Sequence, residues 1–325
     1  MKKIFIGIDI SSKSLDICLK IDGVVQYFSI QNELKAISAF FKKHAPKGTV
    51  VAMENTGRYN WTLFEVLGKL DLMVYVLSPL HLKKSLGLSR GKNDKIDSLR
   101  ICSYIEKNQQ ESAVWKPSSL SIRKLKILLT ERESRVKMKA QLARQQRDYK
   151  LMKSLDMDKE LLKLNKKLID AIDTQLKKIE SDIEKSIMED SELKKKAELI
   201  RSVPGVGKVV CWMMIAKTEG FTTITDPRKM ACYCGVVPFE HQSGSSIKYK
   251  PRVSVFADKG IKTLLHLAAM SAIRLNNELR IYYLRKVEDG KNKMSVLNAV
   301  RNKIIHRIFA VIKNQTMYKN DLVLS

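Results

Sequence analysis

Four carboxylate residues in the first third of the chain have the types and spacing of a metal site. Asp9 and Glu54 each lie at the end of an apolar run typical of a buried strand, and Asp94 and Asp97 begin a segment with helical periodicity. Residues three apart share a helix face, and carboxylates are stabilised near a helix N-terminus, so an acidic first turn alone would explain that pair. All four together predict a site for Mg²⁺ or Mn²⁺, which in pairs ~4 Å apart promote phosphodiester cleavage.

The elements that would position these carboxylates follow from the apolar pattern. A three-strand meander followed by parallel crossovers is the order of an RNase H-like fold, whereas a Rossmann fold begins with a βαβ unit. No glycine-rich phosphate loop follows the first strand, which also counts against nucleotide binding. In this order the first and fourth strands are neighbours, so Asp9 and Glu54 should lie at one edge of the sheet. We expect strands at 3–9, 15–21, 24–30, 48–54 and 73–77, and helices at 32–43, 61–70, from 79, and from 94.

The chain changes character after a linker at residues 116–119. From about 118 to 200 it is rich in Lys, Glu and Leu and contains neither Pro nor Gly. We interpret this segment as two long helices that form a hairpin with a break near residues 156–158. A solvated coiled coil that dimerises and a basic rail for nucleic-acid phosphates, which would include Arg132 and Arg135, are compatible interpretations that the sequence leaves open. The predicted domains are therefore 1–115, 116–198 and 199–325.

The last region begins with a loop at residues 204–208, Pro-Gly-Val-Gly-Lys, that leads into an apolar helix. Such a helix-hairpin-helix-like loop can present backbone N–H groups to a phosphate, and a tight turn between core helices is the simpler alternative. Gly205, Gly207 and Lys208 are the candidate phosphate ligands. A Gly- and Ser-rich loop and a basic, aromatic arm at residues 247–252 follow. We expect further helices at 226–233, 260–275 and 293–313.

The charge of the chain favours a polyanionic partner. Sixty Lys and Arg residues against thirty-four Asp and Glu residues give a net charge of +26, which attracts nucleic acid or an anionic membrane surface. Nucleic acid is preferred because no amphipathic, Trp-rich membrane helix accompanies the charge, and no apolar run approaches the ~20 residues of a membrane span. The five cysteines form no disulfide or zinc pattern and favour a reducing, cytoplasmic setting.

Several short motifs in one order resemble a known family. They are GIDIS around Asp9, MENTG around Glu54, KNDKID with Asp94 and Asp97, then PGVG and GVVPFEHQSGSS. Together, over residues 4 to 275, they resemble the transposases of insertion-sequence family one-ten. That family is related to the Piv-type DNA invertases, and some members are described as bridge-RNA-guided recombinases.

The resemblance implies a RuvC-like N-terminal domain whose four acidic residues (DEDD) hold divalent metal, a coiled coil, and a mainly helical transposase domain with a nucleophilic serine. The acidic residues fall on Asp9, Glu54, Asp94 and Asp97. The serine falls on Ser243, with Ser245 and Ser246 close by. A covalent phosphoserine link would allow strands to be rejoined without ATP, and Lys248, Lys250 and Arg252 could neutralise the charge that develops on the phosphate.

The partners implied by the resemblance are donor and target DNA, an element-encoded bridge RNA, and further copies of the chain as a dimer that pairs into a tetramer. No membrane is expected, and the setting would be the bacterial cytoplasm close to the nucleoid. A Piv-like invertase and a RuvC-type junction nuclease are the alternative enzymes. A basic nucleic-acid-binding scaffold without catalysis is the alternative outside enzymes, and four intact carboxylates argue against it.

Overall fold

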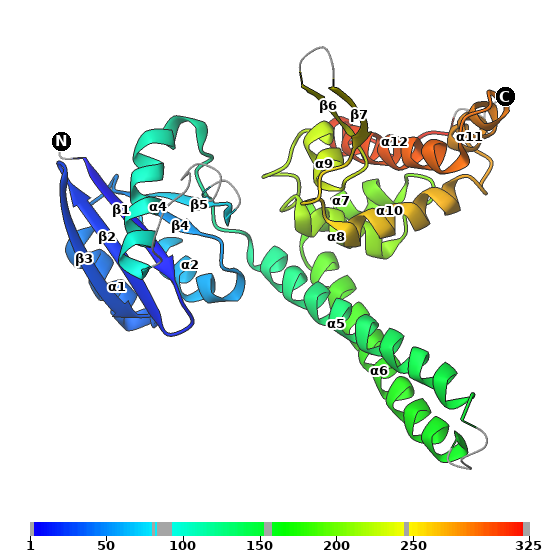
Figure 1. Ribbon diagram of the computed structural model, residues 1–325, viewed down its shortest axis with the longest axis horizontal. Helices are drawn as coiled ribbons and strands as arrows, with labels where there is room; N and C mark the ends of the chain where they lie inside the picture. The colour runs from blue at the N-terminus through cyan, green and yellow to red at the C-terminus, as the bar shows by residue number, and fades with distance from the viewer. Residues whose placement is uncertain (1–2, 80–81, 83–92, 153–157, 244–246, 321–325) are drawn as a thin grey trace. The chain divides into compact units, whose positions relative to one another are not determined.

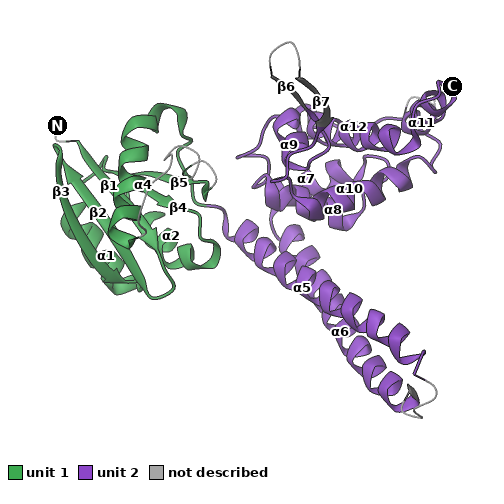
Figure 2. Cartoon of the chain, viewed as in Figure 1, with its two compact units in different colours: residues 1–117 green, residues 118–325 purple. Residues whose placement is uncertain are grey.

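The structure is a computed structural model that describes residues 3–79, 82, 93–152, 158–243 and 247–320 (Figure 1). Its contacts divide the chain into two compact units, Met1–Pro117 and Ser118–Ser325 (Figure 2). The first unit is mixed α/β and the second is mainly helical. The finer division into three domains stays a prediction.

A five-stranded sheet with the order β3-β2-β1-β4-β5 forms the centre of the first unit. β1, β2 and β3 pair antiparallel, whereas β4 lies parallel to both β1 and β5. Asp22 and Gly23 connect β2 to β3 with φ angles of 48° and 91°, the backbone that a two-residue hairpin requires. The observed elements follow the predicted order. The strands are β1 (Ile4–Ile10), β2 (Ser14–Ile21), β3 (Val24–Gln31), β4 (Val50–Glu54) and β5 (Met73–Leu77).

Side-chain alternation along β1 gives the sheet two buried faces. Ile6, Ile8 and Ile10 pack in one core with α1 (Leu34–His44) and α2 (Trp61–Leu67). Residues on the other face, which include Phe5 of β1, pack in a second core with α4 (Asp94–Asn108). Helices therefore cover both faces of the sheet (Figure 1). The short helix predicted from residue 79 lies for the most part outside the described residues.

Gly7 allows α4 to pack directly against the backbone of β1. A Cβ atom at Gly7 would lie 2.3 Å from the backbone oxygen of Ser98 and 2.4 Å from the backbone nitrogen of Cys102. No other residue type fits such an approach, because both neighbouring atoms belong to the helix backbone. The glycine thereby fixes where α4 crosses the sheet, one turn after the helix begins.

Two long helices, α5 (Leu120–Tyr149) and α6 (Asp158–Met188), pack against each other at the start of the second unit. Ion pairs between the two helices join Lys139 to Asp173 at 2.5 Å and Arg132 to Glu180 at 2.7 Å. The helices run antiparallel, because the later residue of α5 meets the earlier residue of α6. Buried Asn165 donates a hydrogen bond to the Leu142 carbonyl oxygen at 3.0 Å. Two long helices were predicted here, and residues 156 and 157 of the predicted break lie outside the described residues.

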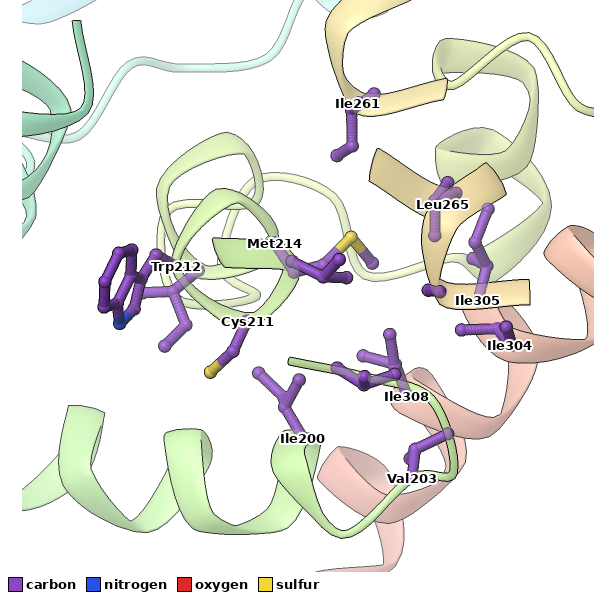
Figure 3. Close-up of a cluster of buried hydrophobic side chains, with 14 of the residues drawn as sticks. Ile200, Val203, Cys211, Trp212, Met214, Ile261, Leu265, Ile304, Ile305 and Ile308 are labelled. Carbon is purple, nitrogen blue, oxygen red and sulfur yellow. The ribbon is translucent and has the colours of Figure 1, made fainter. Parts of the chain in front are cut away.

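The rest of the second unit is a helical body that carries one β-hairpin, formed by β6 (Phe239–Ser243) and β7 (Ile247–Arg252). Its core includes buried Trp212, Met214 and Leu265 (Figure 3). The sequence did not predict the hairpin or α11. The predicted helix 260–275 ends at residue 272. The helices are α7 (Ser191–Arg201), α8 (Lys208–Lys217), α9 (Pro227–Tyr233), α10 (Lys259–Ala272), α11 (Glu278–Glu288) and α12 (Lys293–Asn314). Among the described residues, no helix is long and apolar enough to cross a membrane.

Candidate functional site

All four predicted carboxylates line one cavity in the first unit. The cavity has a volume of about 310 Å³, and its lining includes Asp9, Glu54, Asp94 and Asp97 together with Arg100. Asp94 is exposed, and the other three are partly buried. Sequence reasoning therefore placed the four residues at one site, although it did not foresee the arginine among them.

The sheet and α4 bring these residues together. Asp9 and Glu54 lie at the carboxyl ends of the parallel strands β1 and β4, on the face covered by α4. β1 runs one residue beyond Asp9, to Ile10. The side chain of Asn93 caps α4 by accepting a hydrogen bond from the Lys95 N–H at 3.2 Å. The helix therefore begins at Asp94 and presents its first turn to the end of the sheet.

A buried asparagine holds the backbone at Glu54. Asn60 is fully buried and donates a hydrogen bond to the Glu54 carbonyl oxygen at 3.0 Å. Its own side-chain oxygen accepts from the Thr56 N–H at 2.8 Å and from the Thr56 hydroxyl at 2.7 Å. This clip orders the turn that follows β4. Sequence reasoning missed it.

Crowding of negative charge changes the acidity of Asp9. Burial is the largest cause that raises its pKa to about 6, and repulsion from Asp97, Asp94 and Glu54 adds to it, against a hydrogen bond from the Ile10 backbone. Arg100 compensates in part, because its Nη1 lies 2.8 Å from an oxygen of Asp97. Carboxylates therefore outnumber basic groups among the described residues that line the cavity.

The donor set suits a divalent cation, although the carboxylates do not converge on one point. Carboxylate oxygens are the ligands that Mg²⁺ and Mn²⁺ prefer. Among the described residues, however, no group of three or more His, Cys, Asp or Glu side chains is arranged to hold a metal ion. The chemistry of these carboxylates fits a metal, and their present spacing requires the side chains to close around it.

The predicted serine lies in the other unit. Ser243 is the last residue of β6, where its backbone pairs with Ile247 of β7. Residues 244–246, which include Ser245 and Ser246, lie outside the described residues, as do the side chains of Ser243, Lys248 and Lys250. Arg252 is exposed at the end of β7. The structure thus places the serine next to the tip of a hairpin.

The predicted phosphate loop joins α7 to α8. Gly205 has a φ of +80°, and a Cβ there would lie 2.3 Å from the Ala268 backbone oxygen of α10, so close packing is sufficient reason for this glycine. Gly207 precedes α8 without a side-chain cap, and Lys208 is exposed. Phosphate binding by the loop stays a prediction.

Polar contacts of Asp258 connect α8, α9 and the start of α10. Nζ of Lys217 lies 2.7 Å from an oxygen of Asp258, and the Tyr233 hydroxyl lies 3.3 Å from the same oxygen. Burial raises the pKa of Asp258, but hydrogen bonds from Lys217 and from the Ile261 and Gly260 N–H groups outweigh it and leave the pKa below its ordinary value. Asp258 also caps α10 through those backbone bonds.

Comparison with known proteins agrees with both units. A family model described as a transposase, of the DEDD type found in IS110, matches residues 6–152, and one described as the transposase IS116/IS110/IS902 family matches residues 197–284. The pilin gene-inverting proteins of Moraxella bovis and Moraxella lacunata are each 24% identical over 323 residues, which cover 96% of this chain and 97% of each relative. A Streptomyces coelicolor protein named as an uncharacterized 43.6 kDa protein of insertion element IS110 is 25% identical over 126 residues, which cover 38% of this chain and 30% of that protein.

These matches define the class as enzymes that recombine DNA. Within that class, the chain belongs to the IS110 family of transposases.

Proposed function

We propose that the chain cuts and rejoins DNA strands through a covalent bond between Ser243 and a DNA phosphate, with divalent metal held by Asp9, Glu54, Asp94 and Asp97. The observation that carries this proposal is the cavity that these four carboxylates line. The strand order of the sheet supports an RNase H-like, RuvC-like assignment for the first unit, since the meander and the parallel pairs are those of that fold.

The four carboxylates would hold Mg²⁺ or Mn²⁺ after the side chains close around it. A bound ion would neutralise their charge and polarise a phosphate oxygen. Below about pH 6, Asp9 would lose its proton on binding, because burial and three acidic neighbours raise its pKa to about 6 in the free protein. Arg100 would keep Asp97 oriented through their ion pair.

The serine chemistry conserves the bond energy of the DNA backbone. The Ser243 hydroxyl oxygen would form a bond to phosphorus and lose its proton to a base, while the bond from phosphorus to the departing strand oxygen breaks and that oxygen takes up a proton. Attack by the hydroxyl of a second strand would reverse these events and rejoin the DNA. Lys248, Lys250 and Arg252 would neutralise the charge that develops on the phosphate.

Donor and target DNA are the substrates in this proposal, and an element-encoded bridge RNA guides the choice of site. The net charge of +26 supports binding to more than one nucleic-acid strand. The packing of α5 with α6 is compatible with a coiled coil that joins two copies, which then pair into a tetramer. Purified protein should carry a discrete RNA, and recombination that continues after RNase treatment would exclude guidance.

The decisive experiment detects a protein–DNA adduct that resists denaturant. Purified protein is incubated with its element RNA, labelled donor and target DNA, and Mg²⁺, and wild type is compared with Ser243→Ala and Asp97→Asn. We expect both substitutions to abolish the adduct. Ser245→Ala and Ser246→Ala are the matched controls and should retain it. Free cleaved ends from wild type and Ser243→Ala alike would instead indicate a nuclease that uses metal alone.

DNA inversion is the second candidate, because the pilin gene-inverting proteins align over nearly the whole chain. Inversion and insertion share the proposed chemistry and differ in the arrangement of the DNA sites. A plasmid with two inverted copies of the element end distinguishes the two: inversion of the intervening segment favours an invertase, and its insertion into a target plasmid favours a transposase.

A further inference from the structure

Helices α10 and α12 carry basic side chains that no acidic residue described in the structure neutralises. Arg301 is the deepest of them, with 7% of its surface exposed. Its Nη2 lies 2.7 Å from Nδ1 of His266, and its Nη1 donates to the side-chain oxygen of Asn298 at 3.3 Å. Its Nε is buried and has no hydrogen-bond partner in the described chain. Neutral groups therefore make all the described contacts of this cation.

Such an arrangement is costly for the free protein. A guanidinium group stays protonated at all ordinary pH values, and burying a charge without a counter-ion is strongly unfavourable. Lys262 adds a second positive charge on α10. Burial is the first cause that lowers the pKa of Lys262, and repulsion from Arg301 is the second. The fold therefore holds two repelling cations together, which indicates a purpose other than stability.

The hydrophobic core fixes this basic cluster in place. Ile261 and Leu265 of α10 pack with Ile304 and Ile305 of α12 in the same buried core (Figure 3). Lys262 and His266 directly follow the two α10 core residues in sequence and lie one turn apart on the helix. Both are partly exposed, so the cluster extends from the buried guanidinium to the protein surface.

The basic cluster lies next to residues 235 and 236, in the loop that leads into the β6–β7 hairpin. A Cβ atom at Gly235 would lie 4.0 Å from Nζ of Lys262. Asn298, which contacts Arg301, also donates a hydrogen bond to the Val236 carbonyl oxygen at 2.6 Å. β6 begins three residues later, at Phe239, and ends at Ser243. The charges are therefore close to the segment that carries the candidate nucleophile.

Hydrogen bonding also prepares His266 as a donor. Because Arg301 donates to Nδ1, the neutral ring must carry its proton on Nε2. The cluster thus offers a guanidinium, an ammonium and an imidazole N–H, which is a set of donors suited to phosphate oxygens.

We propose that Arg301, His266 and Lys262 bind a backbone phosphate of the DNA strand that lies along the β6–β7 hairpin. The phosphate would supply the negative charge that the described residues lack. This site is separate from the acidic cavity and from Ser243, and it concerns binding only. A failure of the proposed strand chemistry would therefore leave it untouched.

The test combines DNA binding with thermal stability in the full chain. Fluorescence anisotropy with a labelled DNA duplex of the element end, without divalent metal, compares wild type with Arg301→Met, Lys262→Met and the matched control Lys293→Met. Lys293 is an exposed lysine at the start of α12. We expect Arg301→Met to weaken binding about tenfold and to lower the slope of binding against salt by about one. Lys262→Met should have a smaller effect, and the control should resemble wild type.

Thermal unfolding separates this proposal from a structural role. Arg301→Met should unfold at a higher temperature than wild type, because the substitution removes a buried charge without a described partner. A lower unfolding temperature for the same substitution would mean that Arg301 serves the stability of the fold, and the proposal would fall. Binding equal to that of wild type would also overturn it.

A second probe identifies the nucleic acid. The same measurements with a single-stranded RNA of the element should show a smaller loss in Arg301→Met than the DNA duplex does. A loss confined to the RNA probe would assign the site to RNA phosphate and contradict the DNA assignment. Arg301→Lys, which keeps the charge, should recover part of the DNA affinity and identifies charge as the cause.

Discussion

Asp9 in the first unit and Asp258 in the second are both partly buried aspartates, and the protein treats their charges in opposite ways. Burial and three acidic neighbours raise the pKa of Asp9 to about 6. Asp258 is also buried, but Lys217 and two backbone N–H groups hold its pKa below the ordinary value. The second aspartate is a stabilising part of the fold, whereas the first is held in place at a cost.

The opposite pKa shifts of Asp258 and Asp9 distinguish a residue that stabilises the fold from a residue suited to bind a ligand. At the carboxyl ends of β1 and β4, four carboxylates share one cavity, and Arg100 is the basic residue among the described residues that line it. At the basic cluster of α10 and α12, the opposite charge is in excess. An excess of one sign of charge among neighbouring side chains is a mark of binding sites, and the described residues of the two units show it with opposite signs.

The largest expected effect comes from a substitution that pushes α4, with Asp94 and Asp97, away from the sheet. Gly7→Ala places a methyl group against the backbone of α4, at 2.3 Å from the Ser98 oxygen, and should destabilise the first unit by about 3 kcal/mol. Hydrogen exchange should then rise in β1 and α4 and stay unchanged in α10 and α12. Gly23→Ala is the control. It meets no atom within 4 Å, and its positive φ should cost only about 1–2 kcal/mol. Equal effects of the two substitutions would contradict the close approach.

The second prediction is that Asp9→Asn stabilises the metal-free protein. Because the folded-state pKa of Asp9 lies above its ordinary value of 3.8, wild type should lose stability as pH rises from about 4 through 6. The shift of about two units corresponds to at most about 3 kcal/mol, and solvent screening reduces this to about 1 kcal/mol. Denaturant unfolding at several pH values should show the variant more stable above pH 6 and no difference near pH 4. A variant less stable than wild type at pH 7 would contradict the crowding of charge.

The third prediction concerns an effect on stability that is no larger than the second and has the opposite sign. Asp258→Asn keeps a cap for α10 but removes the ion pair with Lys217, and should destabilise the protein by about 1 kcal/mol at pH 7. Because the folded-state pKa of Asp258 lies below 3.8, this contribution should be lost as pH falls through that region. Asp289→Asn, in the exposed pair with Lys286, is the control and should leave the unfolding midpoint unchanged. An equal loss at pH 7 and at acid pH would exclude the ion pair as the cause.

The site formed by the four carboxylates was predictable because the elements that carry them are determined by nearby sequence. Strand ends, a turn at Asp22-Gly23 and the first turn of a helix are each set by nearby sequence, and a parallel pair brings the ends of β1 and β4 together. The close approach at Gly7 was not predictable, since it depends on which helix residue crosses that point. The same limit hid Arg100, whose place in the cavity follows from that crossing.

The basic cluster escaped sequence analysis for a related reason. Lys262, His266 and Arg301 lie on two separate helices, and nothing in either helix alone distinguishes them from the many other basic residues of the chain. Arg301 is buried where α12 packs against its neighbours in the second unit, and there it contacts His266 of α10. The β6–β7 hairpin was missed because the glycine- and serine-rich sequence that joins its strands is typical of a loop.

The hydrogen bond from Asn165 of α6 to the Leu142 carbonyl of α5 has a consequence for the lengths that this hairpin can take in evolution. One residue inserted in a helix rotates everything beyond it by about 100° and would turn Asn165 away from its acceptor. Seven residues make up nearly two full turns and restore the facing side. Relatives of this chain should therefore lengthen or shorten α5 and α6 together and in steps of about seven residues. The length of the helical hairpin should accordingly vary in discrete steps.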